Sequence, residues 1–291
     1  MAVTAAMVKE LRVRTGAGMM ECKRALVESD GDLAQAADAL RMSGQVKADK
    51  KASRIAAEGQ VAIRSDGSRS VILEANSETD FVAKDENFQH FVDTAAAAVL
   101  SQSPADVEAL MSLPSEGGTL EQVRTELIAK VGENIAVRRF DVVDASGPVG
   151  HYIHGSRIAV VVELAGGDDA LAKDIAMHVA ASNPAHVSAD DVPAEQVNKE
   201  REILSAQAAQ EGKPEEIIAK MVEGRLRKFL SEITLTGQPF VKDPDISVGK
   251  LLQEAGASVT RFIRYEVGEG IEKKADNFVE EVMAQVSQSQ D

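Results

Sequence analysis

The chain has few aromatic residues and almost no cysteine. Phe, Tyr and Trp make up 3% of its 291 residues, Trp is absent, and Cys22 is the only cysteine. A single cysteine excludes an intrachain disulfide and a cysteine-based zinc site. Because 44% of the residues are nonetheless hydrophobic, the core must be built mainly from Ala, Val, Leu, Ile and Met. The length is enough for about two domains.

Positive charge is also in short supply. The chain has 32 Lys and Arg residues against 47 Asp and Glu residues, which gives a formal net charge of −15. Binding to phosphates or to an anionic membrane needs concentrated cations, so this balance argues against nonspecific binding of nucleic acid or of a membrane surface. A protein partner is the better expectation.

Long hydrophobic runs are missing as well. Lys9 and Glu10 interrupt the N-terminus before the apolar region of a signal peptide could form. No apolar run elsewhere approaches the length of a membrane span. The sequence therefore predicts a cytoplasmic protein.

Motifs for catalysis and ligand binding are not found either. The sequence has no G-x-x-x-x-G-K-S/T, G-x-S-x-G or H-E-x-x-H pattern. Gly16-Ala17-Gly18 is better explained as a turn that ends a helix. The histidines form no convincing ligand set, because even the closest pair, His151 and His154, lies three residues apart on an expected strand and diverges. We predict no metal site, no cofactor and no enzymatic activity.

What the sequence does contain begins with a helical module in residues 1–54, linker included. Thr4 and Asp32 are suited to cap the first and third of three short helices, and Gly16 ends the first. This pattern favours a ubiquitin-associated-type fold, which usually serves as a docking module. Residues 45–60, rich in Lys, Ala and Gly, are expected to be a flexible linker. A nucleic-acid patch is the alternative there, but the segment lacks aromatic residues to stack on bases.

The centre of the chain repeats itself after 89 residues. Six of the fifteen residues in 71–85 are identical to those in 160–174. Each copy has the pattern of a hairpin followed by a helix and, later, a third strand. The expected strands are 61–64, 70–75 and 135–143 in the first copy, and 149–153, 158–164 and 259–267 in the second. Strands in a run followed by helices predict an α+β fold of two similar subdomains with antiparallel sheets.

The repeat also indicates the domain bounds. We expect one core subdomain at 55–144 and a second at 145–186 together with 237–270. Residues 187–236 form a helical hairpin inserted into the second copy, with too little apolar surface to be a domain alone. We expect residues 271–291 to form a C-terminal helical module with Phe278, Val279, Val282 and Val286 along one side.

The most informative segment is the strand-to-helix corner of the first copy, Thr79-Asp80-Phe81-Val82. Thr and Asp are capping residues, and the Asp that both copies share, Asp80 and Asp169, fits a structural role at the helix start. Phe81 has no aromatic counterpart in the second copy, where Ala170 stands. A residue that only one copy needs is a functional candidate, although a core Phe packed on its own sheet is the alternative.

Two segments resemble signatures of the elongation factor Ts family, the bacterial nucleotide-exchange factors for elongation factor Tu. One is residues 74–84, EANSETDFVAK, and the other is residues 11–26, LRVRTGAGMMECKRAL. They occur in the order that the family has, and the resemblance covers essentially the whole chain.

The resemblance implies how these parts are used. It implies that Thr79, Asp80, Phe81 and Val82 wedge near the Mg²⁺ and phosphate site of elongation factor Tu and promote release of GDP, so that GTP can bind. The weaker partner contacts that it implies are Val131, His154, Arg12, Met19 and Met20. Residues 187–236 match a coiled-coil module that serves self-association in some members, so a homodimer is among the expectations.

A second reading of the sequence belongs to another class. A nonenzymatic adaptor would use the N-terminal helical module alone to bind ubiquitin-like or other helical partners. Release of a fluorescent GDP from elongation factor Tu discriminates the two readings, because only the exchange factor accelerates it.

Overall fold

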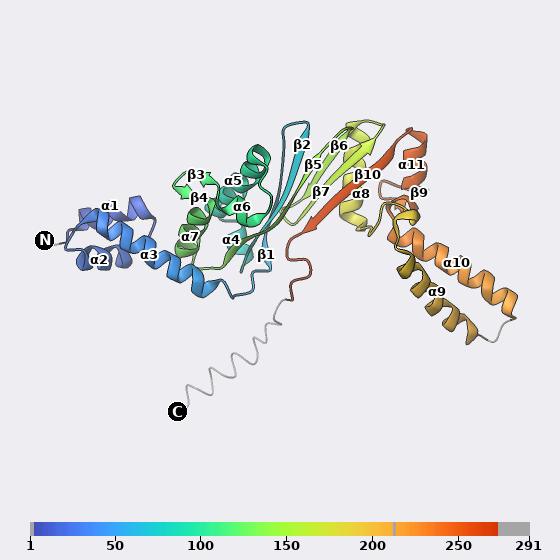
Figure 1. Cartoon of the computed structure of the whole chain (residues 1–291), viewed down its shortest axis with the longest axis horizontal. Helices are drawn as coiled ribbons and strands as arrows, with labels where there is room; N and C mark the ends of the chain where they lie inside the picture. Colours follow the sequence, from blue (N-terminus) through green and yellow to red (C-terminus); the bar gives the residue numbers. More distant parts are fainter. Residues whose placement is uncertain (1–2, 212–213, 273–291) are drawn as a thin grey trace, which may run out of the picture.

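The computed structural model describes residues 3–211 and 214–272. Figure 1 shows an elongated molecule with the N-terminal helices at one end, two sheets in the middle and a helical hairpin at the other end. The expected C-terminal helix, with Phe278, Val279, Val282 and Val286, lies outside the described residues. None of the helices within the described ranges has the length and apolar character needed to span a lipid bilayer.

Three helices form the N-terminal module, as the sequence predicts: α1 (Ala5–Thr15), α2 (Met19–Glu28) and α3 (Leu33–Lys51). The Thr4 hydroxyl accepts the N–H of Met7, and the Asp32 carboxylate accepts the N–H groups of the first turn of α3, so both predicted caps are confirmed. Gly16 ends α1 in the left-handed region, at φ 66°. The helices bury one shared cluster: Leu11, Cys22, Ala25, Leu26 and Ala36.

The predicted linker over residues 45–60 is mostly wrong. Helix α3 continues to Lys51, and strand β1 begins at Glu58. The second half of α3 packs on α7 (Leu120–Val131), where Gly44 lies against Ala129. The physical reason is that Lys, Ala and Gln are strong helix formers, so a composition that is compatible with a linker also extends a helix that has a surface to pack on.

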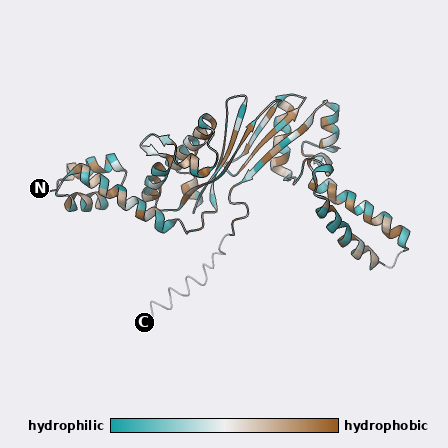
Figure 2. Ribbon diagram, in the orientation of Figure 1, coloured by the Kyte–Doolittle hydropathy of each residue, from teal (hydrophilic) through white to brown (hydrophobic). Residues whose placement is uncertain are grey.

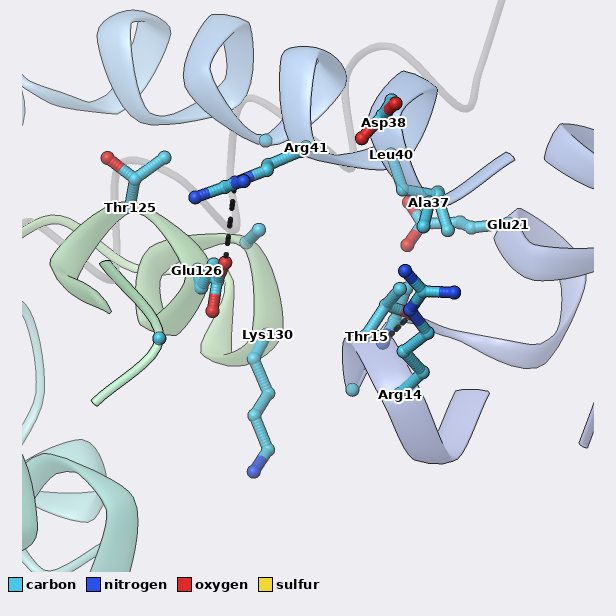
Figure 3. Close-up of a pocket in the computed structure, with 15 residues that line it drawn as sticks. Arg14, Thr15, Glu21, Ala37, Asp38, Leu40, Arg41, Thr125, Glu126 and Lys130 are labelled. Atoms are coloured by element: carbon cyan, nitrogen blue, oxygen red, sulfur yellow. Dashed lines mark hydrogen bonds and ion pairs between the residues drawn. The ribbon is translucent and has the colours of Figure 1, made fainter. Parts of the chain in front are cut away.

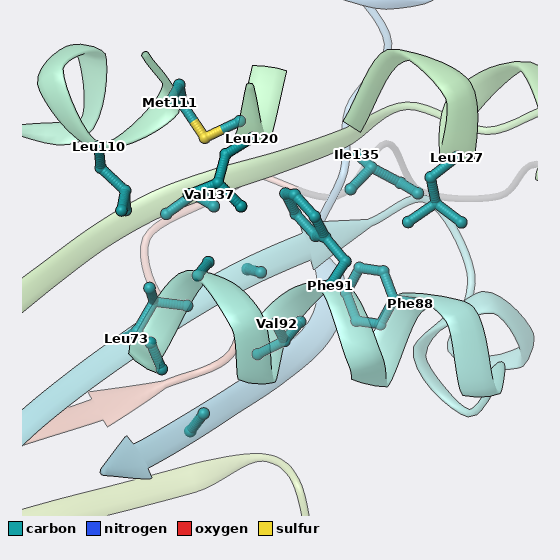
Figure 4. Packing of buried hydrophobic residues seen from close by; sticks show 14 of the residues in the cluster. Leu73, Phe88, Phe91, Val92, Leu110, Met111, Leu120, Leu127, Ile135 and Val137 are labelled. Carbon is teal, nitrogen blue, oxygen red and sulfur yellow. The ribbon is translucent and has the colours of Figure 1, made fainter. Parts of the chain in front are cut away.

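The first sheet has the order β1-β2-β5 and is antiparallel, with β1 (Glu58–Ser65), β2 (Arg69–Ser77) and β5 (Ile135–Asp144). Helices α5 (Glu86–Gln102) and α7 cover one face. Phe88 and Phe91 of α5 are fully buried beside Ile135 of β5 and Leu127 of α7, in a cluster that also contains Leu73 of β2 (Figure 4). The remaining elements of this copy are α4 (Asp80–Ala83), α6 (Val107–Met111), β3 (Pro114–Ser115) and β4 (Gly118–Thr119).

The second sheet repeats this topology. Its order is β10-β7-β6, with β6 (Val149–His154), β7 (Ile158–Ala165) and β10 (Ser258–Glu266), and α8 (Asp169–Ser182) packs on its outer face. In both copies the second strand of the hairpin is central and the late third strand pairs beside it, which confirms the predicted repeat of antiparallel α+β units. The other elements here are η1 (Ala189–Asp191), η2 (Leu235–Gly237), β8 (Pro239–Phe240), β9 (Asp243–Ser247) and α11 (Val248–Glu254).

The two sheets pack against each other through their inner faces, so the centre is layered helix, sheet, sheet, helix (Figure 1). Val61 and Ile72 from the first sheet meet Val161 and Tyr265 from the second. Figure 2 shows that hydrophobic residues are concentrated in these strands. The strands can be apolar on both faces because one face meets helices and the other meets the second sheet.

A buried carboxylate joins β2 and β5 of the first sheet to the chain that follows β10 of the second. Glu74 of β2 has no exposed surface and accepts hydrogen bonds from Arg138, Arg139 and the backbone N–H of Gly268, the last at 2.8 Å. Burial by itself would raise the pKa of Glu74, but these hydrogen bonds and one from Asn76 outweigh it and hold the pKa below its ordinary value. Glu74 is therefore a buried anion that ties β5 and the chain after β10 to β2.

The inserted hairpin consists of α9 (Ala194–Ala209) and α10 (Glu215–Ile233). It has a small apolar seam of its own, formed by Leu204, Ala208, Val222 and Leu226. His178 of α8, a fully buried histidine, bonds the segment that follows α10. The Nδ1 atom of His178 accepts the N–H of Val241 at 3.1 Å, so the proton lies on Nε2, which donates to Gln238 Oε1 at 2.9 Å.

We expect the stability of the fold to fall at mildly acidic pH. Burial lowers the pKa of His178, with the Gln238 hydrogen bond partly opposing it, and burial lowers the pKa of His151, with the charge of Asp169 partly opposing it. Unfolded histidine titrates near pH 6.5. The unfolded state therefore binds more protons, so the stabilising contribution is complete above pH 6.5 and is lost as pH falls through the lowered pKa values, at up to about 1.4 kcal/mol per pH unit and histidine.

Urea unfolding between pH 8 and pH 5 measures this dependence. A glutamine can replace both hydrogen bonds of His178 without titrating, so His178→Gln should reduce the slope, whereas His90→Gln, at an exposed position, should not. An unchanged slope in His178→Gln would refute the assignment.

We also expect the hairpin to be dispensable for the folded core. Its seam is separate from the clusters beneath the sheets, so replacing residues 196–228 by a short Gly-Ser loop should leave a cooperative thermal transition. Precipitation of this variant would show that Val222 and Leu226 belong to the core. Sedimentation of both chains also tests self-association. If the hairpin forms a dimer interface, only the full-length chain should form dimers.

Candidate partner-binding site

The corner after β2, Thr79–Val82, is buried in the core on one side and exposed to solvent on the other. Thr79 caps the short helix α4, with its hydroxyl accepting the N–H of Val82 at 3.4 Å. Val82 and Ala83 are buried in the cluster of the first sheet. Phe81, between them and the cap, is 80% exposed. The alternative of a core Phe81 is therefore wrong, because the turn directs Val82 inward and Phe81 outward.

Asp80 does not cap the helix, contrary to the sequence-based expectation. It is the first residue of α4, and the preceding Thr79 is the cap; in the second copy Asp168, before Asp169, likewise caps α8. The Asp80 carboxylate instead pairs with Lys84 at 2.6 Å. This hydrogen bond is the main cause that lowers the pKa of Asp80, and the charge of Arg157 adds to it. Asp80 therefore presents an anion next to Phe81.

The corner is a separate turn only in the first copy. Helix α4 ends at Ala83, and Asp85 caps α5 by accepting the N–H groups of Asn87 and Phe88. In the second copy α8 runs without a break from Asp169, and the matching Ala170 is small. The first copy therefore has a short, independently capped turn that carries the exposed aromatic ring.

Loop 132–134, after α7, braces the corner from behind. The two carboxylate oxygens of Glu133 accept the N–H of Thr79 at 2.9 Å and its hydroxyl at 2.7 Å. The backbone N–H of Asn134 donates to Glu78 at 2.6 Å. No sequence pattern singles out these residues, since the partners lie more than fifty positions apart. Val131, which the family resemblance does indicate, ends α7 and is half-buried against the first sheet's cluster.

The tip of the β6-β7 hairpin lies near the same corner. His154 is exposed at the end of β6, within 3.2 Å of the Tyr152 hydroxyl. The tip is tied to β1, because the N–H of Val61 donates to the carbonyl of Ser156 at 2.9 Å. Arg157, the next residue, is close enough to influence Asp80. The hairpin tip that carries His154 is thus bonded to β1 of the other copy, and its Arg157 lies within charge range of Asp80.

The other predicted contacts lie apart from this corner. Arg12, Met19 and Met20 line an open cavity of about 570 Å³ on the N-terminal module. Met19 and Met20 are 59% and 72% exposed, a large apolar exposure for a small module. Figure 1 shows these helices at one end of the molecule and α4 in the middle. The site residues therefore form two separate surfaces.

A second, narrower cavity separates the N-terminal module from the core. It has a volume of about 300 Å³ and lies between α1, α3 and α7. Figure 3 shows Arg41 reaching across it to Glu126, with Lys130 and Arg14 on its lower side. Both charge signs line this cavity, so it favours no anionic or cationic ligand. Among residues 3–211 and 214–272, no group of three or more His, Cys, Asp or Glu side chains is placed to hold a metal ion.

Comparison with known proteins agrees with the two signatures. The profile of the family described as Elongation factor TS matches residues 78–269. Proteins named Elongation factor Ts are similar over almost the entire chain. That of Thioalkalivibrio sulfidiphilus (strain HL-EbGR7) is 62% identical over 289 residues, covering 98% of this chain and 99% of the relative. That of Alkalilimnicola ehrlichii is 60% identical over 288 residues, with 98% and 99% covered, and that of Legionella pneumophila (strain Paris) is 58% identical over 287 residues, with 98% of both covered. The chain belongs to the elongation factor Ts family.

Proposed function

We propose that the chain binds the GDP form of elongation factor Tu and promotes release of the nucleotide through the Thr79–Val82 corner. Membership of the elongation factor Ts family supports the exchange activity. The single observation that carries the role of the corner is Phe81, an aromatic side chain that is 80% exposed on a turn whose other side is anchored. An exposed ring on a rigid turn can be inserted into a partner without cost to its own core.

The mechanism is physical and requires no covalent step. A GTPase holds GDP through backbone donors, a lysine and Mg²⁺. An exchange factor binds a conformation in which these contacts are weaker, and coupling is reciprocal, so GDP in turn weakens binding of the factor. A thousandfold faster release requires the barrier to fall by about 4 kcal/mol. Burial of one Phe side chain in the partner supplies roughly 2–3 kcal/mol of this.

Asp80 supplies the second part of the wedge. Its carboxylate lies beside Phe81 and is ionised, since Lys84 and Arg157 lower its pKa. An anion brought close to the Mg²⁺ and phosphates of the partner competes for the metal and repels the nucleotide. Phe81 would then displace partner side chains while Asp80 disturbs the charge balance at the metal.

The N-terminal module supplies affinity for the same partner. The exposed Met19 and Met20 side chains are flexible and apolar, which suits docking on a helix or a groove of another protein. Arg12 lies in the same cavity and adds a charge that can pair with an acidic partner residue. His154 and Val131 add contacts around the corner. Two separate surfaces on one chain allow one to hold the partner while the other distorts it.

An adaptor that docks only through the N-terminal module is the second candidate, and the exposed methionines favour it. The experiment that separates the candidates loads elongation factor Tu with a fluorescent GDP and follows release. Acceleration by catalytic amounts of the chain supports exchange, whereas binding without acceleration supports the adaptor.

Phe81→Ala should lower the maximal rate of GDP release by about 30-fold to 160-fold, since losing roughly 2–3 kcal/mol of burial on the partner raises the barrier by that amount. The thermal midpoint should change little, because Phe81 is exposed. Stopped-flow release and thermal unfolding measure the two effects.

Two matched variants serve as controls for Phe81→Ala. Phe88→Ala truncates a fully buried Phe and should cost about 3–5 kcal/mol of stability. Ala170→Phe places a ring at the matching position of the second copy and should not create a second exchange site. If Phe81→Ala unfolds as Phe88→Ala does, the wedge must be assigned to another residue.

Met19→Ser combined with Met20→Ser should raise the concentration of the chain at half-maximal release by about tenfold, which corresponds to about 1.4 kcal/mol of docking. The maximal rate should stay the same, because the corner is untouched. Met42→Ser, at a methionine that is 68% exposed on α3, serves as the control. A fall in the maximal rate alone would contradict a docking role.

A further inference from the structure

We propose that Glu133 and Asn134 are positioning residues for nucleotide release, holding the Phe81 corner and the N-terminal module in one fixed arrangement. This inference rests on the proposed function and concerns residues that contact neither nucleotide nor metal. Three segments meet here: residues 51–54 at the end of α3, residues 77–79 at the end of β2, and residues 132–134 after α7. We call them together the bracket.

Glu133 sets the conformation of the corner. Its carboxylate receives both the N–H and the hydroxyl proton of Thr79, at 2.9 and 2.7 Å. With its proton directed to Glu133, the Thr79 oxygen offers its lone pairs to the N–H of Val82, at 3.4 Å, and so caps α4. The carbonyl of Thr79 is also held, because it accepts the hydroxyl of Ser77 at 2.9 Å. Phe81 therefore projects from a turn whose capping residue is fixed at three atoms.

Asn134 connects this corner to the end of α3. It is 7% exposed, and its amide nitrogen donates to the carbonyls of Arg54 at 2.8 Å and Ala52 at 3.4 Å. Its backbone N–H donates to Glu78, which also pairs with the Arg54 side chain at 3.4 Å. One buried residue thus bonds the segment after the docking module and the residue before the corner.

The junction between the module and the core is tight at the bracket and more open farther toward the N-terminus. The Lys51 ammonium donates to the carbonyl of Gly132, which places α3 directly on the bracket. Further toward the N-terminus, the cavity of about 300 Å³ separates the body of the module from α7, and the ion pair that crosses it, Arg41 with Glu126, spans 3.9 Å (Figure 3). The bracket and the second half of α3 therefore fix where the docking surface lies relative to Phe81.

This arrangement has a kinetic consequence. When docking and wedge surfaces are held at a fixed separation, engagement of one brings the other to its target without a further loss of conformational freedom. Glu133 governs how well Phe81 is aimed once the complex has formed. Asn134 governs how strongly docking by the module assists the corner.

The first test is Glu133→Gln. The amide keeps the size of the side chain but removes its charge, and the amide nitrogen cannot accept the hydroxyl proton of Thr79 as the carboxylate oxygen does. The maximal rate of GDP release from elongation factor Tu should fall about tenfold, while the half-maximal concentration stays within about twofold. Glu116→Gln, at an exposed loop position, is the matched control. A variant with a normal maximal rate, or with an equal loss in Glu116→Gln, would overturn the role of Glu133.

The second test is a double-mutant cycle between the bracket and the docking surface. Glu78→Gln weakens the bracket at a partly exposed position, and Asn134→Ala removes its buried centre. In either background, Met20→Ser should raise the half-maximal concentration less than it does in the unaltered chain, because the module is no longer held in register. Additive effects in both backgrounds would refute the coupling. Glu78→Gln keeps this test decisive if Asn134→Ala does not fold.

A partner-free measurement separates this inference from the proposed function. Hydrogen exchange at the Thr79 and Val82 amides should accelerate about tenfold or more in Glu133→Gln, while exchange within β2 stays slow. Unchanged protection at Thr79 overturns the bracket even if the unaltered chain releases GDP normally. If the unaltered chain fails to accelerate release, the proposed function falls, and the exchange data alone then decide whether the bracket orders the corner.

Discussion

The contact between the two sheets is the constraint on which the rest of the structure depends. Each sheet has only three strands, too few to be stable without a covered second face. The inner faces meet mainly through aliphatic side chains. The buried Glu74 fixes their relative position, because its carboxylate oxygens must accept hydrogen bonds from Arg138, Arg139 and the Gly268 backbone at once. Removing one partner of such a buried pair typically costs about 3–5 kcal/mol. This fixed stack holds the β6-β7 tip, with His154 and Arg157, beside the corner of the other copy.

The repeat explains how one of two similar units acquired a separate binding feature. Both copies place an Asp at the first helical position after the central strand, and both use the preceding residue as the cap. The copies diverge a few residues later, because Asp85 starts a new helix in the first copy, whereas α8 continues in the second. A short turn that is capped at its start and followed by a new cap can be rigid without being part of a long helix. Phe81 occupies that turn, and the fold of the sheet does not depend on it.

Much of this arrangement could be predicted from local patterns. Alternating and continuous apolar runs gave the six main strands, and capping residues gave the starts of α1 and α3, because both signals come from neighbouring residues. Thr79 and Asp80 are both good caps, so the pattern alone could not decide which one acts. The end of α3 could not be predicted, because the composition of residues 45–51 suits both a linker and a helix, and the surface of α7 is what favours the helix. The bracket leaves no local pattern in the sequence, because the bonds of Glu133 and Asn134 join residues that are 54 to 82 positions apart.

The exposure of Phe81 depends on the same bonds. An aromatic side chain on a flexible loop would collapse onto nearby apolar surface, since burial of Phe is worth roughly 2–3 kcal/mol. Here the backbone on its N-terminal side is held by Glu133 and that on its C-terminal side by the buried Val82 and Ala83, so the ring cannot turn inward without breaking the cap. The burial energy that this prevents in the free chain remains available when a partner offers an apolar pocket. The polar bonds behind the corner therefore determine how much of the burial energy of Phe81 is available for binding the partner.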